Sequence, residues 1–146
     1  MKTFGRVLTA MITSFNDDGS VNIENSVAIA EHLLNHGSDG LVVCGTTGEN
    51  PTMSRESKIA LFKAVAEFCG DKGTIIANVG SNDTKGSVDF VKEVSAIPGI
   101  DGLLVVVPYY NKPNQQGQYL HFKSIAEATT LPIMVYNVPG RVGTGI

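Results

Sequence analysis

Residues 41–49 read LVVCGTTGE, and this stretch does most to decide how the chain folds. Its apolar first part predicts a buried strand, which ends in two adjacent hydroxyls held between glycines. Glycine lets the backbone turn sharply and approach a ligand closely, and threonine hydroxyls and freed backbone N–H groups can donate hydrogen bonds. A plain strand-to-helix turn uses the same residue types, since short glycine motifs often arise without function. The stretch therefore predicts a strand followed by either a small carboxylate site or a simple turn.

Short apolar, β-rich runs of this kind recur along the chain. They are nearly continuous instead of alternating with polar residues, which is typical of strands covered on both faces in a parallel sheet. Segments with helical periodicity lie between them. The repeat of about 30 residues is that of a βα unit, and it predicts a parallel α/β protein with right-handed crossovers. The predicted strands span residues 7–13, 41–44, 74–79, 102–107 and 133–137.

The four predicted helices between these strands carry their own start and stop signals. Ser54 and Asp83 are suited to cap the second and third helices, and Gly37 is placed to end the first. Apolar spacing predicts which face of each helix is buried. In chain order these faces comprise Ile23, Val27, Ala30, Leu33 and Leu34; Ile59, Phe62, Val65 and Ala66; Val88, Val91 and Val94; and Tyr119, Phe122, Ile125 and Ala126.

Two architectures fit this order of elements. One is an open, doubly wound sheet, and the other is part of a (β/α)8 barrel, which needs about 250 residues when complete. No Gly-x-Gly-x-x-Gly motif follows the first strand and no P-loop is present, which disfavours a nucleotide-binding open sheet. The length of 146 residues fits one domain.

Composition narrows the classes of function. The chain has 42% hydrophobic and 17% charged residues and a formal net charge of −3, as expected for a soluble globular protein. It lacks the basic stripe of a nucleic-acid-binding surface and the apolar stretch of about 20 residues that spans a membrane. Cys44 and Cys69 are predicted to be reduced packing residues of a cytosolic protein. His32, His36 and His121 are expected on helix surfaces, without metal-ligand spacing.

Polar side chains gather where the predicted strands end, which is where ligands bind in parallel α/β folds. A Tyr-Tyr pair follows the fourth strand, and residues 136–141 read YNVPGR at the end of the fifth. Tyrosine, with a pKa of about 10, can relay protons within a chain of hydroxyls. Arg141 can bind a carboxylate through two hydrogen bonds. The sequence thus predicts proton shuttling and carboxylate capture, although no lysine at a strand end, metal cluster or Ser-His-Asp order supplies a nucleophile.

Three ordered motifs resemble the dihydrodipicolinate synthases, which belong to the pyruvate-dependent class I aldolase family that includes N-acetylneuraminate lyase. These motifs are residues 45–49 (GTTGE), 108–113 (PYYNKP) and 136–141 (YNVPGR). The resemblance runs the whole length of the chain and covers about the first half of the family's barrel. It implies that residues 1–146 are a single partial TIM-barrel domain, with about five parallel strands and four helices, lacking the C-terminal strands.

The resemblance also implies a reaction. In this family a lysine forms a Schiff base with pyruvate, the enamine attacks L-aspartate semialdehyde, and the product cyclises. Matching positions make Thr46 and Tyr136 a proton relay that Tyr110 completes. In the family, the tyrosine that Tyr110 matches reaches into the neighbouring subunit's site.

Substrate binding is implied for three further positions. Thr47, chiefly through its backbone N–H, and Gly48 would hold the pyruvate carboxylate, and Arg141 would bind the carboxylate of the second substrate. The family uses no cofactor or metal for this reaction. The resemblance implies a cytoplasmic homo-oligomer, a dimer or tetramer, that acts in lysine and diaminopimelate biosynthesis without nucleic-acid or membrane partners.

The chain departs from the family's pattern in several places. Residues 13–15 read TSF where TPF is usual, and Val142 replaces a threonine that supports the arginine. Arg55 and Gly86 stand where a histidine and a glutamate bind lysine in the forms that lysine inhibits. We therefore expect lysine inhibition to be weak or absent.

The largest departure concerns the Schiff-base lysine, which in the family ends the sixth strand, whereas the sequence stops at Ile146 after the fifth. We expect this polypeptide alone to lack synthase activity, and its unpaired first and fifth strands to favour association. Two rival interpretations stay open: another pyruvate-dependent aldolase, such as a sugar-acid lyase, and a non-catalytic, truncated assembly module. The Tyr-Asn-Val-Pro-x-Arg motif favours the synthase over the sugar-acid lyases.

Overall fold

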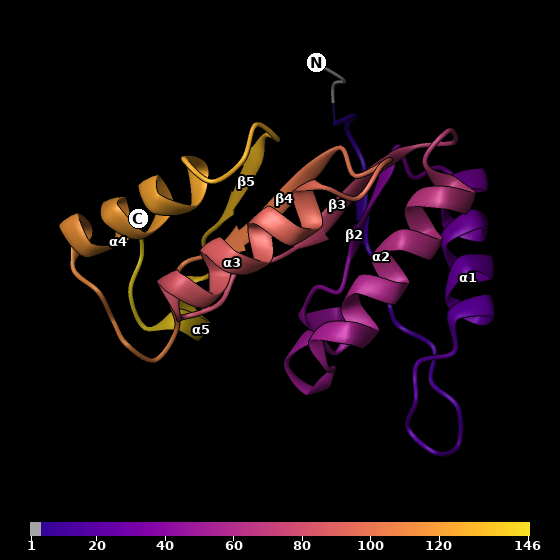
Figure 1. Cartoon of the computed structure of the whole chain (residues 1–146), viewed down its shortest axis with the longest axis horizontal. Helices are drawn as coiled ribbons and strands as arrows, with labels where there is room; N and C mark the ends of the chain where they lie inside the picture. The colour runs from indigo at the N-terminus through magenta and orange to yellow at the C-terminus, as the bar shows by residue number, and fades with distance from the viewer. Residues whose placement is uncertain (1–3) are drawn as a thin grey trace. The chain divides into compact units, whose positions relative to one another are not determined.

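The structure is a computed structural model that describes residues 4–146. These residues form two compact units, each built from parallel strands and helices (Figure 1). Unit 1 comprises residues 4–78 with 97–101, and unit 2 comprises residues 79–96 with 102–146. No helix in the described part of the chain is both long and apolar enough to cross a membrane.

Unit 1 contains strands β1 (Leu8–Ala10), β2 (Gly40–Val43) and β3 (Thr74–Asn78) and helices α1 (Ile23–Asn35) and α2 (Arg55–Cys69). Strand β2 pairs in parallel with β1 and with β3. Helices α1 and α2 pack against each other, and Figure 1 shows them side by side in indigo and magenta. Every residue of β2 and β3 is buried, as the continuous apolar runs predicted.

Strand β1 is shorter than the predicted run of residues 7–13. The N–H of Met11 still donates to the carbonyl of Val42 at 3.2 Å. The chain then leaves the sheet, and the N–H of Ser14 donates to the hydroxyl of Ser26 on α1 at 3.0 Å. The end of the predicted run is therefore a loop that is tied to α1.

Unit 2 contains helix α3 (Thr84–Ser95), strand β4 (Gly102–Val106), helix α4 (Gln115–Ala126), strand β5 (Ile133–Tyr136) and the short helix α5 (Pro139–Val142). Strands β4 and β5 are parallel, and their register places Val106 opposite Tyr136. No pattern in the sequence predicted α5. It begins at Pro139, which suits a first helical turn, and it is capped by Gly143, whose φ is 73°.

The predicted helix boundaries are confirmed at the atomic level. The Ser54 hydroxyl accepts from the N–H of Ser57 at 3.1 Å, and the Asp83 carboxylate accepts from the N–H of Lys85 at 3.0 Å. Helix α1 ends at Asn35 with His36 as its C-cap, and Gly37 follows with a φ of 106° that only glycine adopts readily. Predicted faces of α1, α2 and α3 are buried or half-buried, as expected.

The predicted buried face of α4 is wrong for two of its four positions. Tyr119 is 59% exposed and Ala126 is also exposed, whereas Gln118 and His121 are each only 3% exposed. Both side chains form hydrogen bonds there, although Oε1 of Gln118 and Nε2 of His121 have no partner among the described residues: the other imidazole nitrogen of His121 lies 2.8 Å from the hydroxyl of Thr84. His121 is therefore not the surface residue that the sequence predicted.

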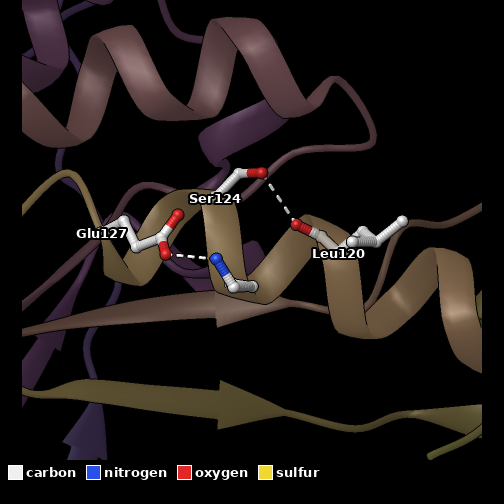
Figure 2. A network of polar contacts seen from close by, with 4 residues as sticks. Leu120, Ser124 and Glu127 are labelled. Atoms are coloured by element: carbon white, nitrogen blue, oxygen red, sulfur yellow. Dashed lines mark hydrogen bonds and ion pairs between the residues drawn. The ribbon is translucent and has the colours of Figure 1, made fainter.

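The outer face of α4 carries its own polar contacts (Figure 2). The Ser124 hydroxyl donates to the Leu120 carbonyl at 2.8 Å, and Lys123 forms an ion pair with Glu127 one turn later. Such exposed pairs contribute little to stability. The inward-facing Gln118 and His121 therefore matter more for how α4 is placed.

Candidate active site

The loop after β2 starts with a left-handed residue. Cys44 has a φ of 56° and is fully buried. The side-chain amide of Asn78, at the end of β3, donates to the Cys44 carbonyl at 2.8 Å. Non-glycine residues rarely adopt such a φ, and they keep it only when their surroundings hold it. Asn78 thus fixes the point at which the chain turns out of the sheet.

Residues 45–49 then form a single turn of 3₁₀ helix, η1 (Thr46–Gly48). The N–H of Gly48 donates to the Gly45 carbonyl at 3.0 Å, and the N–H of Glu49 donates to the Thr46 carbonyl at 3.0 Å. Gly45 and Gly48 are buried, while Thr46 and Thr47 are exposed. The loop thus presents two adjacent threonines outward from a buried glycine base, as the motif predicted.

Gly48 shapes this loop and does not offer a free N–H, because its N–H already bonds to Gly45. A Cβ atom on Gly48 would lie 3.0 Å from the Met11 carbonyl oxygen and 3.0 Å from the Thr13 hydroxyl. The Thr13 hydroxyl also donates to the Gly48 carbonyl at 2.7 Å, in a buried contact. Close packing against the segment that follows β1 therefore favours glycine here.

Sequence reasoning missed Thr13 as a support of this loop. The only available signal was its position near the end of the first predicted strand, in the segment that reads TSF. Its partner, Gly48, lies 35 residues away. Periodicity and local motifs cannot detect such a contact.

Burial shifts the pKa values of two titratable groups behind the loop. Desolvation raises the pKa of the Cys44 thiol to about 12, with a small opposing effect from the nearby Lys58 ammonium. The half-buried Lys58, on α2, has its pKa lowered by the same kind of desolvation. Cys44 is thus a protonated packing residue, and neither it nor Cys69 is in a disulfide. This confirms that both cysteines are reduced and buried.

Tyr110 lies in the loop after β4 and is 89% exposed. Its φ of 68° is left-handed, and Lys112, two residues later, has a φ of 46°. A left-handed backbone at a residue other than glycine costs on the order of 1–3 kcal/mol of conformational free energy. The loop thus presents the Tyr110 phenol outward from a strained backbone.

Tyr136 and Arg141 lie at the end of β5 and on α5. Tyr136 is the last residue of β5 and is 44% exposed, and its carbonyl accepts from the N–H of Val107 at 3.0 Å. Arg141 is exposed on α5, whose end meets the loop of Tyr110: a Cβ on Gly143 would lie 2.8 Å from Cε of Lys112. Within unit 2, the Tyr110 loop and the arginine-bearing helix therefore touch.

The segment that follows α5 is held by α4. Gln115 donates to the Gly145 carbonyl at 2.7 Å, and Gln118 donates to the same carbonyl at 3.2 Å. Gln118 also donates to the Pro113 carbonyl at 3.1 Å. The buried Gln118 thus links the segment before α4 to the segment that follows Arg141 in the sequence.

Each predicted site residue lies just after a strand or at its end. Unit 1 carries Thr46, Thr47 and Gly48 on one loop, and unit 2 carries the predicted phenols and the guanidinium on three short segments. No group of three or more potential metal ligands occurs within residues 4–146. Unit 1 thus offers hydroxyls, and unit 2 offers phenols and a guanidinium, which are residue types able to relay protons or bind carboxylates.

Parallel βα units with polar residues at the carboxyl ends of their strands are characteristic of the (β/α)8-barrel proteins. Within that class, the chain belongs to the dihydrodipicolinate synthetase family, whose family model matches residues 3–146. It is 53% identical over 140 residues to the 4-hydroxy-tetrahydrodipicolinate synthase of Moorella thermoacetica, a match that covers 96% of this chain and 48% of that protein.

Solved structures agree. A dihydrodipicolinate synthase from Bacillus anthracis superimposes on the whole chain with a TM-score of 0.96 and 43% identity, and the match covers 50% of that chain. The chloride-inhibited enzyme from Acinetobacter baumannii, complexed with pyruvate, gives a TM-score of 0.93 at 37% identity over 98% of this chain and 49% of that one. The predicted fold, the N-terminal part of a (β/α)8 barrel, is therefore confirmed. The chain spans about half the length of these relatives.

Proposed function

We propose that the full-length protein carrying this chain is a lyase that condenses pyruvate with L-aspartate semialdehyde through a lysine Schiff base, in lysine and diaminopimelate biosynthesis. One observation carries the proposal. Three motifs lie at strand ends, at residues 45–49, 108–113 and 136–141. The first two begin two residues after the ends of β2 and β4, and the third begins at the last residue of β5. They do so in a chain that belongs to the dihydrodipicolinate synthetase family.

The loop after β2 suits the pyruvate carboxylate. Thr46 and Thr47 open the η1 turn, where backbone N–H groups lack partners within the helix, and both threonines are exposed. We assign the backbone N–H of Thr47 to the carboxylate. Gly48 contributes through its missing side chain, since its own N–H bonds to Gly45 at 3.0 Å.

The Schiff base forms when a lysine amine displaces water from the pyruvate carbonyl, and this lysine would lie outside residues 1–146. Loss of a methyl proton gives the enamine, whose carbon attacks the aldehyde carbon and forms the new C–C bond. The aldehyde oxygen takes up a proton, and the amino group of the adduct then displaces the lysine as the ring closes. We assign the proton transfers to the hydroxyls of Thr46, Tyr136 and Tyr110.

Arg141 would select the second substrate. A guanidinium binds a carboxylate through two parallel hydrogen bonds, and Arg141 is exposed on α5, just before the segment whose Gly145 carbonyl accepts from Gln115 and Gln118 of α4. A short, carboxylate-bearing aldehyde suits this residue better than a long polyhydroxy sugar acid. The 89% exposure of Tyr110 fits a homo-oligomer in which this side chain reaches a second copy.

The test uses the full-length protein with pyruvate and L-aspartate semialdehyde. We expect turnover, and borohydride with pyruvate should trap an adduct on a lysine outside residues 1–146, detected by mass spectrometry. Residues 1–146 expressed alone should give no adduct and no turnover. Cleavage of sugar acids without condensation would point to a sugar-acid lyase, and a full-length protein without either activity would point to an assembly module.

We also propose that the protein works in the cytoplasm. Both cysteines of the described chain are buried and unpaired, as is usual where thiols are kept reduced. Fractionation of cells with an antibody against the chain would test this, and recovery in a secreted fraction would contradict it.

A further inference from the structure

The backbone around Tyr110 forms an unusual turn. The N–H of Asn111 donates to the carbonyl of Tyr109 at 2.8 Å, and the residue between them, Tyr110, has a φ of 68°. A two-residue hydrogen bond around a residue with positive φ is the mark of the rarer, strained form of the γ-turn. Strained backbone of this kind persists only where the surroundings over-determine it, and it clusters at functional sites.

Packing of the Tyr110 side chain cannot supply that constraint, because 89% of it is exposed. Two asparagine amides supply it instead. The amide nitrogen of Asn82 donates to the Tyr109 carbonyl at 3.3 Å and to the side-chain oxygen of Asn111 at 3.3 Å. The amide nitrogen of Asn111 donates back to the Asn82 carbonyl at 2.8 Å. Both residues that flank Tyr110 therefore form hydrogen bonds with Asn82.

Neighbouring hydrogen bonds fix the position of Asn82. Asn82 directly precedes Asp83, which caps α3. The Ser81 hydroxyl donates to the Asp83 carbonyl at 3.1 Å, and it lies 2.9 Å from the hydroxyl of the buried Ser87 on α3. Asn82 therefore holds the Tyr110 turn against the start of a helix within the same unit.

We propose that Asn82 and Asn111 are positioning residues that hold the Tyr110 turn, and with it the phenol, in the geometry that proton transfer requires. This inference rests on the proposed function. Neither asparagine touches the reacting atoms; both act through the turn. The chemistry requires an amide at position 82, because its nitrogen donates to two oxygen atoms, whereas a carboxylate of the same shape can only accept.

The experiment is a double-mutant cycle on the full-length protein, with Asn82→Asp, Tyr110→Phe and the combined variant. Asn82→Asp should lower kcat by about 10- to 100-fold, the effect of misplacing a catalytic group by about 1 Å, and change the KM for pyruvate much less. In the Tyr110→Phe background the same substitution should change kcat by less than about twofold, because residues that act through one group are non-additive. Asn111→Asp should behave in the same way.

Asn25→Asp is the matched control, since Asn25 is exposed on α1, and it should leave kcat unchanged. Circular dichroism and thermal melting identify any variant that fails to fold, and Asn111→Asp then serves in place of Asn82→Asp. Three results would each overturn the inference. The double variant could lose kcat by the full product of the two single losses, or kcat could be unchanged in Asn82→Asp or in Tyr110→Phe. No turnover by the wild-type protein would instead overturn the proposed function.

Discussion

The Thr13 hydroxyl donates a hydrogen bond of 2.7 Å to the carbonyl of Gly48 across 35 residues of sequence. It joins the segment after β1 to the base of the loop that presents Thr46 and Thr47. Both ends of the bond are buried, so water cannot replace the lost partner if one is removed. The shape of the loop after β2 therefore depends on a residue from the preceding strand segment.

Replacing Thr13 with valine should loosen this loop. Valine keeps the volume of threonine but leaves the Gly48 carbonyl without its donor, which costs about 1–3 kcal/mol for a buried group. We expect kcat/KM for pyruvate in the full-length protein to fall about tenfold. Thr13→Ser restores the hydroxyl and should recover most of the activity; equal losses in both variants would show that the hydrogen bond is unimportant.

The two glycines of the loop should differ in their tolerance of alanine. A Cβ on Gly48 would lie 3.0 Å from the backbone oxygen of Met11, so Gly48→Ala should destabilise the protein by about 1–3 kcal/mol. The nearest atom to a Cβ on Gly45 is 3.8 Å away, and its φ of −66° suits alanine. Gly45→Ala should therefore change the free energy of unfolding by less than about 1 kcal/mol. Urea denaturation of both variants measures the contrast, which equal losses would contradict.

His121 should make stability depend on pH. Burial lowers its pKa below the usual 6.5, with partial opposition from the Asp83 carboxylate. A lowered pKa in the folded state means that the unfolded chain takes up the proton first. The stabilising contribution is thus complete above pH 6.5 and is lost as the pH falls below that value.

The measurement is Tm as a function of pH for the wild-type protein and for His121→Gln. Between pH 6.5 and about pH 5 the wild-type Tm should fall by about 2 °C more than that of the variant. His32→Gln, at an exposed position on α1, is the control and should keep the wild-type slope. Parallel curves for wild type and His121→Gln would contradict the prediction.

Cys44 and Cys69 should resist alkylation in the folded protein. Both are fully buried, and burial raises the pKa of each thiol, that of Cys44 to about 12. The thiolate is the reactive form, so iodoacetamide at about pH 8 should leave the peptides containing these residues unmodified. The same reagent in guanidinium chloride should modify both. Rapid labelling of native Cys44 would show that the loop after β2 opens.

Lysine should inhibit the full-length protein weakly. The family resemblance implies that Arg55 and Gly86 replace a lysine-binding histidine and glutamate, and we expect millimolar lysine to leave activity nearly unchanged. The structure also indicates that Gly86→Glu would displace the side chain that caps α3. A Cβ on Gly86 would lie 2.5 Å from Oδ2 of Asp83, the capping residue of α3. Strong inhibition of the wild-type enzyme would refute this prediction.

The sequence predicted the parts of the fold that local chemistry controls. Strand positions followed from continuous apolar runs, and Ser54, Asp83 and Gly37 marked helix ends because capping involves only neighbouring residues. The buried face of α4 could not be predicted in this way. Gln118 and His121 face inward because Thr84, Pro113 and Gly145 offer them partners, and apolar spacing carries no information about such pairing.

The same distinction between local patterns and distant contacts applies to the candidate site. Its reactive residue types could be read from the ordered motifs, whereas its supports could not. Thr13 reaches Gly48 over 35 residues and Asn111 reaches Asn82 over 29. The left-handed backbone at Cys44 and Tyr110 was also unpredictable, because bulky side chains disfavour a positive φ and glycine would be expected there.

This strain has a consequence for protein engineering. Glycine and asparagine adopt a positive φ more readily than other residues, so a stabilising design would favour them at Cys44, Glu49, Tyr110 and Lys112. Substitution at Tyr110 would relax the backbone and remove the phenol at the same time. Thermostability campaigns on this protein should therefore keep position 110 fixed, since a higher melting temperature gained there would come with the loss of the phenol to which we assign proton transfer.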